Sequence, residues 1–401
     1  MVDTTLQAET IPTVERDRAQ AIHPFRIAIG QADVDDLRDR LGQTRWPDEL
    51  PADGWSRGVP LDYLRELAEY WRTSYDWRVH EARLNGVPQF RTEIDGQTLH
   101  FLHSRSPEPD ALPIIITHGY PSSFVEMLEI IGPLTDPRSH GHNPADAFHV
   151  VAPSVPGFGF SVPVGETGWD MPRTARAFAE LMHRLGYERY GAHGSDIGAG
   201  VAGMLASIDL GHVVGVHATT DPTSFIILGS EIPIDTSGLS AAEREHVTRL
   251  QEHFQEGKGY LQLQSNRPRT LSYALTDSPV GQLAWIVEPF KEWTNPAATV
   301  PDDAIDRDLL LTNVSLYWFT RTGASAANFL YESAHSVDWV AASDVPQGMA
   351  VFNADPILRR VLDPENTLAH WSEFDRGGHF PAMEAPDLLV DDVRTFFRRF
   401  R

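Results

Sequence analysis

Cysteine is absent from this chain of 401 residues. Its absence excludes disulfide bonds, thiolate metal sites and a cysteine nucleophile. Basic residues are few: 33 Lys and Arg stand against 56 Asp and Glu, which gives a formal net charge of −23. A surface of this sign repels phosphate groups and anionic lipid, so we expect neither nucleic acid nor a membrane as a partner.

Long hydrophobic runs are also missing. The sequence has no stretch of about eighteen apolar residues that could cross a bilayer. Its N-terminal segment, up to Phe25, has neither the basic start nor the apolar core of a signal peptide. We therefore expect a cytoplasmic protein. The composition, with 41% hydrophobic residues and 19 Phe, is that of a globular protein with a large core.

The hydrophobic pattern divides the chain into segments. Short apolar runs that alternate with Gly-rich turns and helical stretches predict an α/β fold with a mostly parallel central sheet. A long aromatic, helical interruption of this pattern predicts a lid over the carboxyl ends of the strands. The expected segments are a tail at 1–22, a helical N-terminal domain at 23–102, core at 103–221, a helical lid at 222–338 and core again at 339–401.

A glycine-rich turn, GSDIG at 194–198, is the most informative motif. In the G-x-S-x-G elbow of serine hydrolases the nucleophile lies midway between two glycines, and here that position is Asp196. A nucleophilic Ser195 would need glycines where the chain has His193 and Ile197. Asp196 would lie at a helix N-terminus, which favours an ionised carboxylate. Taken alone, the motif fits a helix-capping Asp slightly better than a nucleophile.

Other motifs follow in a definite order. HGYP at 118–121 comes after a predicted strand, so the backbone amides of Tyr120 and Ile197 are expected to form an oxyanion hole. His379, in RGGHF, is the expected general base, and Asp355, at the end of the preceding strand, is the expected acid that orients it. The order nucleophile, acid, histidine is that of α/β-hydrolases. The other acidic residues that could replace Asp355 are Asp338 and Glu332.

Together these motifs resemble those of microsomal-type epoxide hydrolases of the soluble bacterial branch. The resemblance runs from about Pro24 to the C-terminus, and its lid segment is NRPRTLSYALTDSPVGQLAWIVEPFKEWT. It implies an α/β-hydrolase core with an N-terminal domain wrapped on it, and no cofactor. Membrane-bound members carry an anchor helix, which we do not expect here. Soluble relatives take part in detoxification and in the tailoring of antibiotics such as enediynes.

The resemblance also implies two lid tyrosines that protonate the epoxide oxygen. Tyr260 matches the first. On an ungapped count Leu330 occupies the second position, and Tyr331 follows one residue later. One residue along a helix rotates a side chain by about 100°, so Tyr331 is a weaker candidate for the second donor. Trp285, Trp318 and Leu330 are expected to line the substrate pocket.

The expected reaction converts an apolar epoxide, aryl in one version, to a vicinal diol. A carboxylate can open the strained ring by direct displacement, and water activated by His379 then hydrolyses the ester on Asp196. The expected partners are the epoxide and water, with a homodimer as the default assembly. Two alternatives stay open: a dehalogenase, although such enzymes commonly have Trp where this chain has Ile197, and a silent binding protein, which the change at Leu330 keeps open but the set of Asp196, Asp355 and His379 disfavours. The histidine-rich segment at 140–149 is expected to be a solvated loop, so no metal site is predicted.

Overall fold

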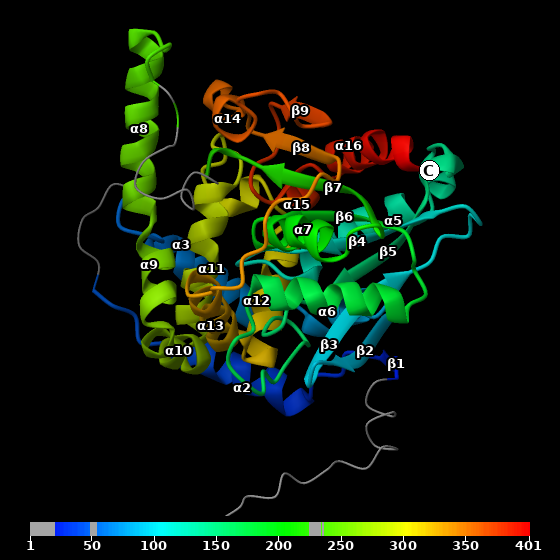
Figure 1. Ribbon diagram of the computed structural model, residues 1–401. Coiled ribbons are helices and arrows are strands. Elements are labelled where there is room, and N and C mark those ends of the chain that lie inside the picture. Colours follow the sequence, from blue (N-terminus) through cyan, green and yellow to red (C-terminus); the bar gives the residue numbers. More distant parts are fainter. Residues whose placement is uncertain (1–20, 49–53, 224–233, 235) are drawn as a thin grey trace, which may run out of the picture.

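The computed structural model describes residues 21–48, 54–223, 234 and 236–401, and for residues 253–256 it describes only the backbone. The predicted tail at 1–22 therefore lies almost wholly outside the described residues. Figure 1 shows a central sheet with helices on both faces and a group of helices at one end.

The central sheet contains nine strands in the described part of the chain, in the order β1-β2-β3-β5-β4-β6-β7-β8-β9. Strands β4 to β9 pair in parallel, whereas β1, β2 and β3 extend the sheet in antiparallel fashion. The strands are β1 (His23–Phe25), β2 (Gln89–Ile94), β3 (Gln97–Ser104), β4 (Leu112–Thr117), β5 (Phe148–Pro153), β6 (Tyr190–Ser195), β7 (Val213–Thr220), β8 (Gln347–Phe352) and β9 (His370–Phe374).

Strand β3 runs through the domain boundary that the sequence predicts after residue 102. It pairs with β5, so that Leu102 lies opposite Ala152. The β2–β3 hairpin is therefore part of the core sheet, and the N-terminal segment is helical only between β1 and β2. The boundary prediction is corrected at this point, because a hairpin with a buried face joins whichever sheet edge is open to it.

Apolar runs explain the central strands. Ile114, Ile115 and Ile116 in β4 are all fully buried, as expected for a parallel strand covered by helices on both faces. Helices α6 (Met171–Arg184) and α7 (Ile197–Ile208) cover one face, and α5 (Leu128–Thr135) and α16 (Pro386–Phe397) cover the other. Two shorter helices, α14 (Pro356–Leu362) and α15 (Pro381–Glu384), follow β8 and β9.

The lid lies between β7 and β8. Its helices are α8 (Ala241–Gly257), α9 (Gly259–Asn266), α10 (Pro268–Asp277), α11 (Pro279–Trp293), α12 (Arg307–Thr320) and α13 (Thr322–Ala334), and α8 projects from the body of the molecule in Figure 1. The N-terminal helices α2 (Gln31–Gly42), α3 (Leu61–Thr73) and α4 (Trp77–Leu84) pack on α11 and α12.

Buried polar contacts fix this packing. The indole N–H of Trp71 in α3 donates to the hydroxyl of Ser315 in α12 at 2.9 Å. The predicted class, an α/β-hydrolase fold with a mostly parallel sheet and a helical lid, is confirmed. Within the described ranges, no helix combines the length and the apolarity needed to cross a bilayer.

Candidate active site

Asp196 occupies the tight turn between β6 and α7. Its backbone has φ 53° and ψ −122°, a strained conformation outside the left-handed helical region that L-residues rarely adopt. The flanking glycines are required by contact distance: a Cβ atom on Gly198 would lie 2.0 Å from the carbonyl oxygen of Thr117, and one on Gly194 would lie 2.1 Å from that of Gly198. The glycine spacing read from the sequence therefore matches a turn that holds Asp196 at its tip.

Two backbone amides hold the Asp196 carboxylate. The amide of Tyr120 donates to its Oδ1 atom at 2.9 Å, and the amide of Ile197 contributes a second hydrogen bond. Burial alone would raise the pKa of Asp196, but His379 and these two amides outweigh burial, so the pKa falls below its ordinary value. The carboxylate is therefore ionised at neutral pH. The structure brings the two predicted oxyanion-hole residues together here.

His379 faces the other oxygen of this carboxylate. Its Nε2 atom lies 3.5 Å from Asp196 Oδ2, and its Nδ1 atom lies 3.0 Å from Asp221 Oδ1. The His379 side chain is only 10% exposed. Burial would lower the pKa of His379, but the charges of Asp221 and Asp196 raise it well above its ordinary value.

Asp355 does not contact His379, which corrects the sequence prediction. Its Oδ1 atom accepts the amide of Ile357 at 2.9 Å and so caps α14, and its Oδ2 atom lies 2.6 Å from Nε2 of His246 on lid helix α8. The carboxylate beside His379 is Asp221, which directly follows β7 and has a 3% exposed side chain.

Sequence reasoning missed Asp221 although a signal was present. Like Asp355, Asp221 follows a predicted strand and precedes a proline. Thr223 holds the Asp221 carboxylate in place, since its hydroxyl lies 2.8 and 2.9 Å from the two carboxylate oxygens. Of the other acids considered, Asp338 is directed elsewhere and pairs with Arg176 at 3.6 Å.

A cavity of about 510 Å³ opens above Asp196. His379, Tyr260, Tyr120 and Leu330 line it together with Asp196, and most of the remaining wall is apolar. The ring of Tyr260 is parallel to that of Tyr120, with centroids 6.3 Å apart. Burial, and then the charge of Asp196, raise the pKa of Tyr260 well above its ordinary value, so its hydroxyl keeps its proton.

Three predicted site residues lie outside this cavity, and these predictions are corrected. Tyr331 stacks on His335 with ring centroids 4.2 Å apart, because one step along α13 turns it away and leaves Leu330 inside. The indole N–H of Trp285 donates to the hydroxyl of Tyr120 at 2.6 Å, so Trp285 supports a cavity residue from behind. Trp318 lies near the N-terminal helix α2, with its ring centroid 5.8 Å from the guanidinium of Arg40.

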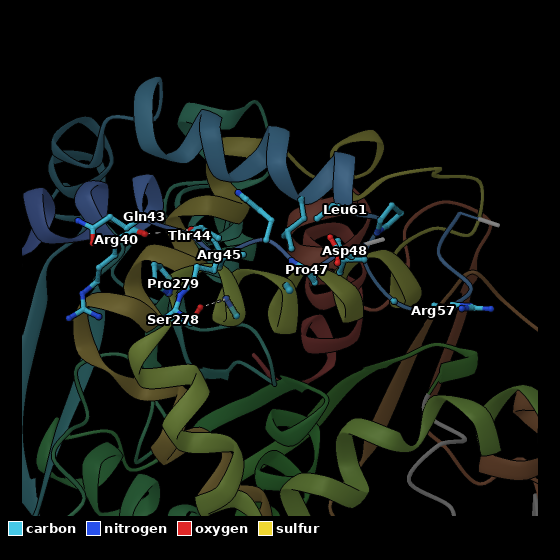
Figure 2. A pocket seen from close by; sticks show the side chains of 18 of the residues that line it. Arg40, Gln43, Thr44, Arg45, Pro47, Asp48, Arg57, Leu61, Ser278 and Pro279 are labelled. Carbon is cyan, nitrogen blue, oxygen red and sulfur yellow. Dashed lines mark hydrogen bonds between the residues drawn. The ribbon is translucent and has the colours of Figure 1, made fainter. Parts of the chain in front are cut away.

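A larger cavity, of about 760 Å³, lies between residues in the ranges 40–48 and 54–64 and the start of α11. Figure 2 shows part of its lining, which includes Arg40, Thr44, Arg45 and Ser278. None of the described residues that line it belongs to the predicted catalytic set. Size alone therefore does not mark the candidate active site, which is chosen on the convergence of Asp196, His379 and Tyr260.

Comparisons with known proteins agree with this geometry. Residues 22–127 match the family model described as "Epoxide hydrolase N terminus". A protein of Stigmatella aurantiaca strain DW4/3-1, provisionally named as an epoxide hydrolase, is 45% identical over 383 residues, which is 95% of this chain and 86% of that protein. Epoxide hydrolase 1 of Sus scrofa is 32% identical over 408 residues, covering 94% of this chain and 88% of that protein.

A solved structure is similar over nearly the whole chain. The epoxide hydrolase of Aspergillus niger superposes with a TM-score of 0.79 at 29% identity, covering 96% of this chain and 97% of that one. The sequence relatives and this structure each match nearly the whole of this chain. The chain therefore belongs to the epoxide hydrolase family.

Proposed function

We propose that the protein hydrolyses apolar epoxides, including aryl epoxides, to vicinal diols through a covalent ester on Asp196. The observation that carries this proposal is the convergence of an ionised carboxylate, a histidine and a protonated tyrosine in one largely apolar cavity. Its volume of about 510 Å³ lies within the range of small-molecule sites. The rings of Trp293 and Tyr260, with centroids 5.0 Å apart, offer an aromatic wall to an aryl substituent.

In the first step, Oδ2 of Asp196 attacks one epoxide carbon and the bond from that carbon to the ring oxygen breaks. The ring oxygen takes the proton of the Tyr260 hydroxyl, which leaves a hydroxyalkyl ester and a tyrosinate. Oδ1 takes no part in the displacement, because the amide of Tyr120 holds it at 2.9 Å. Asp196 is suited to this step because its lowered pKa keeps it ionised.

In the second step, His379 removes a proton from water, and the resulting hydroxide attacks the ester carbon. The negative charge develops on Oδ1, where the amides of Tyr120 and Ile197 stabilise it. The diol leaves with the proton from His379, and the proton released on reforming the carboxylate returns to the tyrosinate. Asp221, in contact with Nδ1, orients His379 and stabilises its charged form.

Esterification also changes His379. While Asp196 is ionised, its charge helps to raise the pKa of His379. The ester is neutral, so this contribution disappears and the pKa of His379 falls. A larger fraction of His379 is therefore neutral, and able to accept a proton, at the stage at which a base is needed.

The test is a single turnover of excess enzyme with styrene oxide in ¹⁸O-labelled water. We expect the label in the peptide that contains Asp196 and not in the diol of the first turnover, and we expect Asp196→Asn to form no diol. Label in the first diol would mean that water attacks the ring directly. If no epoxide in a panel is turned over, the proposed activity is wrong.

A further inference from the structure

A second polar cluster lies at the opposite edge of the sheet from the active site. It consists of His183 near the end of α6, Asp209 directly after α7, and His212 directly before β7. In parallel strands all amino ends lie at one edge and all carboxyl ends at the other. Asp196 and Asp221 follow the carboxyl ends of β6 and β7, so the cluster is separate from the catalytic residues.

The three side chains converge on one point. Nε2 of His183 lies 3.0 Å from Asp209 Oδ2, and Nδ1 of His212 lies 2.8 Å from Asp209 Oδ1. The two imidazole rings have centroids 4.7 Å apart. Ligands at zinc distances in a tetrahedral site are about 3.4 Å apart. One ligand atom from each of the three residues lies within 4.8 Å of the others, so a small rearrangement of the side chains would give this spacing.

His212 provides an independent indication of a ligand. Its Nδ1 atom is buried, yet it has no hydrogen-bond partner among the described residues, although Asp209 is close. The nitrogen therefore faces the carboxylate in an orientation that does not form a hydrogen bond. Buried ring nitrogens are normally satisfied, and a metal ion between the nitrogen and the carboxylate would satisfy this one.

Tyr190 holds the Asp209 carboxylate in place through a hydrogen bond. This fully buried residue of β6 donates its hydroxyl hydrogen to Asp209 Oδ2 at 2.6 Å. Metal sites in proteins commonly have such an outer hydrogen bond to a ligating carboxylate. The two histidine side chains are each 41% exposed, so an ion can enter from solvent and water can complete its coordination.

We propose that His183, Asp209 and His212 bind one zinc ion at the surface of the protein. Two imidazole nitrogens with a single carboxylate favour zinc over calcium and magnesium, which prefer oxygen ligands. The ion would fasten the end of α6 to the connection between α7 and β7. Its role is structural, because the site lies at the edge of the sheet away from Asp196. No sequence motif indicated this cluster, since His183 is distant in the chain from the other two residues.

The test is calorimetric titration of Zn²⁺ into protein that carries no polyhistidine tag and has been freed of metal by chelation. We expect one saturable site per chain in the native protein, and its loss in the double variant His183→Gln/His212→Gln. The exposed His142→Gln is the matched control and should bind zinc as the native protein does. Tyr190→Phe keeps all three ligands and should weaken binding by about 10- to 100-fold.

Two further measurements do not depend on the folding of the variants. Zn²⁺ should raise the melting temperature of the native protein, and chelation should reverse the rise. Co²⁺ should give the visible absorption of a nitrogen- and oxygen-ligated site, while epoxide turnover stays unchanged. Native protein that takes up no zinc saturably, or a folded double variant that binds zinc as tightly as the native protein, would overturn the proposal.

Discussion

The Nδ1 atom of His379 lies 3.0 Å from the Oδ1 atom of Asp221. In the proposed mechanism this contact lets Asp221 orient His379, and it gives the first prediction. Asp221→Asn should lower kcat by about 10²- to 10⁴-fold, because an amide neither stabilises the charged imidazole nor fixes its tautomer. Steady-state kinetics with styrene oxide measure the effect.

Asp355→Asn is the matched control for that variant. Asp355 caps α14 and pairs with His246; Asn can keep the cap and loses only the charge of the pair, so stability should fall by less than about 1 kcal/mol and kcat should change by only a few-fold. A larger loss of kcat in Asp355→Asn than in Asp221→Asn would show that Asp355, and not Asp221, is the acid that orients His379.

Tyr260 and Tyr331 should differ sharply when each loses its hydroxyl. Tyr260 lines the cavity with Asp196, so Tyr260→Phe should slow ester formation by about 10²- to 10³-fold, by analogy with the loss of one oxyanion-hole donor. Tyr331 stacks on His335 outside the cavity, and Tyr331→Phe should leave the rate of ester formation within about twofold of the native rate. Rapid-quench measurements of ester formation compare the two, and equal losses would contradict the assignment.

The two chemical steps should respond differently to pH. Asp196 has a lowered pKa, so ester formation should stay constant across the neutral range. His379 must be neutral to act as a base, and its pKa is raised by Asp221, so ester hydrolysis should accelerate as pH rises. Stopped-flow fluorescence can follow both steps, because the ring of Trp293 lies 5.0 Å from that of His379. Parallel pH profiles for the two steps would contradict this scheme.

The buried carboxylate of Asp392, on helix α16, should control the stability of the protein in acid. Burial would raise the pKa of Asp392, but His217, Ser372 and His370 lower it to about 2. A depressed native pKa means that the stabilisation is present above pH 4 and is lost as pH falls from about 4 towards 2. Asp392→Asn should therefore lower the free energy of unfolding by about 2 kcal/mol at pH 7 and by much less at pH 2.5.

The neighbouring Asp391 is the control for this prediction. Its side chain is 65% exposed, so Asp391→Asn should change stability by less than about 1 kcal/mol at either pH. Urea denaturation of the two variants at both pH values measures the difference. An equal loss in the two variants would show that surface charge, and not the buried contacts, sets the acid stability.

The fold and the turn that holds Asp196 could be predicted because local chemistry decides them. The glycines around Asp196 are required by contacts with adjacent backbone, and their spacing is visible in the sequence. The acid could not be assigned in this way. Both Asp221 and Asp355 stand between a strand and a proline, and local sequence does not reveal which turn faces His379. Because β7 pairs with β6, Asp221 follows the strand next to the one that precedes Asp196, and that neighbour relation is a property of the folded sheet.

Which lid residues line the cavity was harder to predict from the sequence, for a similar reason. The lid helices that carry Tyr331, Trp285 and Trp318 have exposed and buried faces that depend on how the lid packs against the N-terminal helices. The helical period predicts which residues share a face of a helix but not which face meets the cavity. Leu330 was placed in the cavity correctly because the one-residue offset from Tyr331 changes the direction of the side chain by a known angle.

The backbone N–H of His379 donates to the carbonyl oxygen of Trp293, the last residue of lid helix α11, at 2.8 Å. The next lid residues are held as well, since Glu384 accepts the amide of Asn295 at 2.9 Å. His379, the proposed general base, is thus anchored to the lid, which lines the candidate substrate cavity. A chimera that receives a foreign lid will keep its turnover only if the transplanted segment also preserves this carbonyl, so substrate range and catalytic rate cannot be exchanged as independent modules.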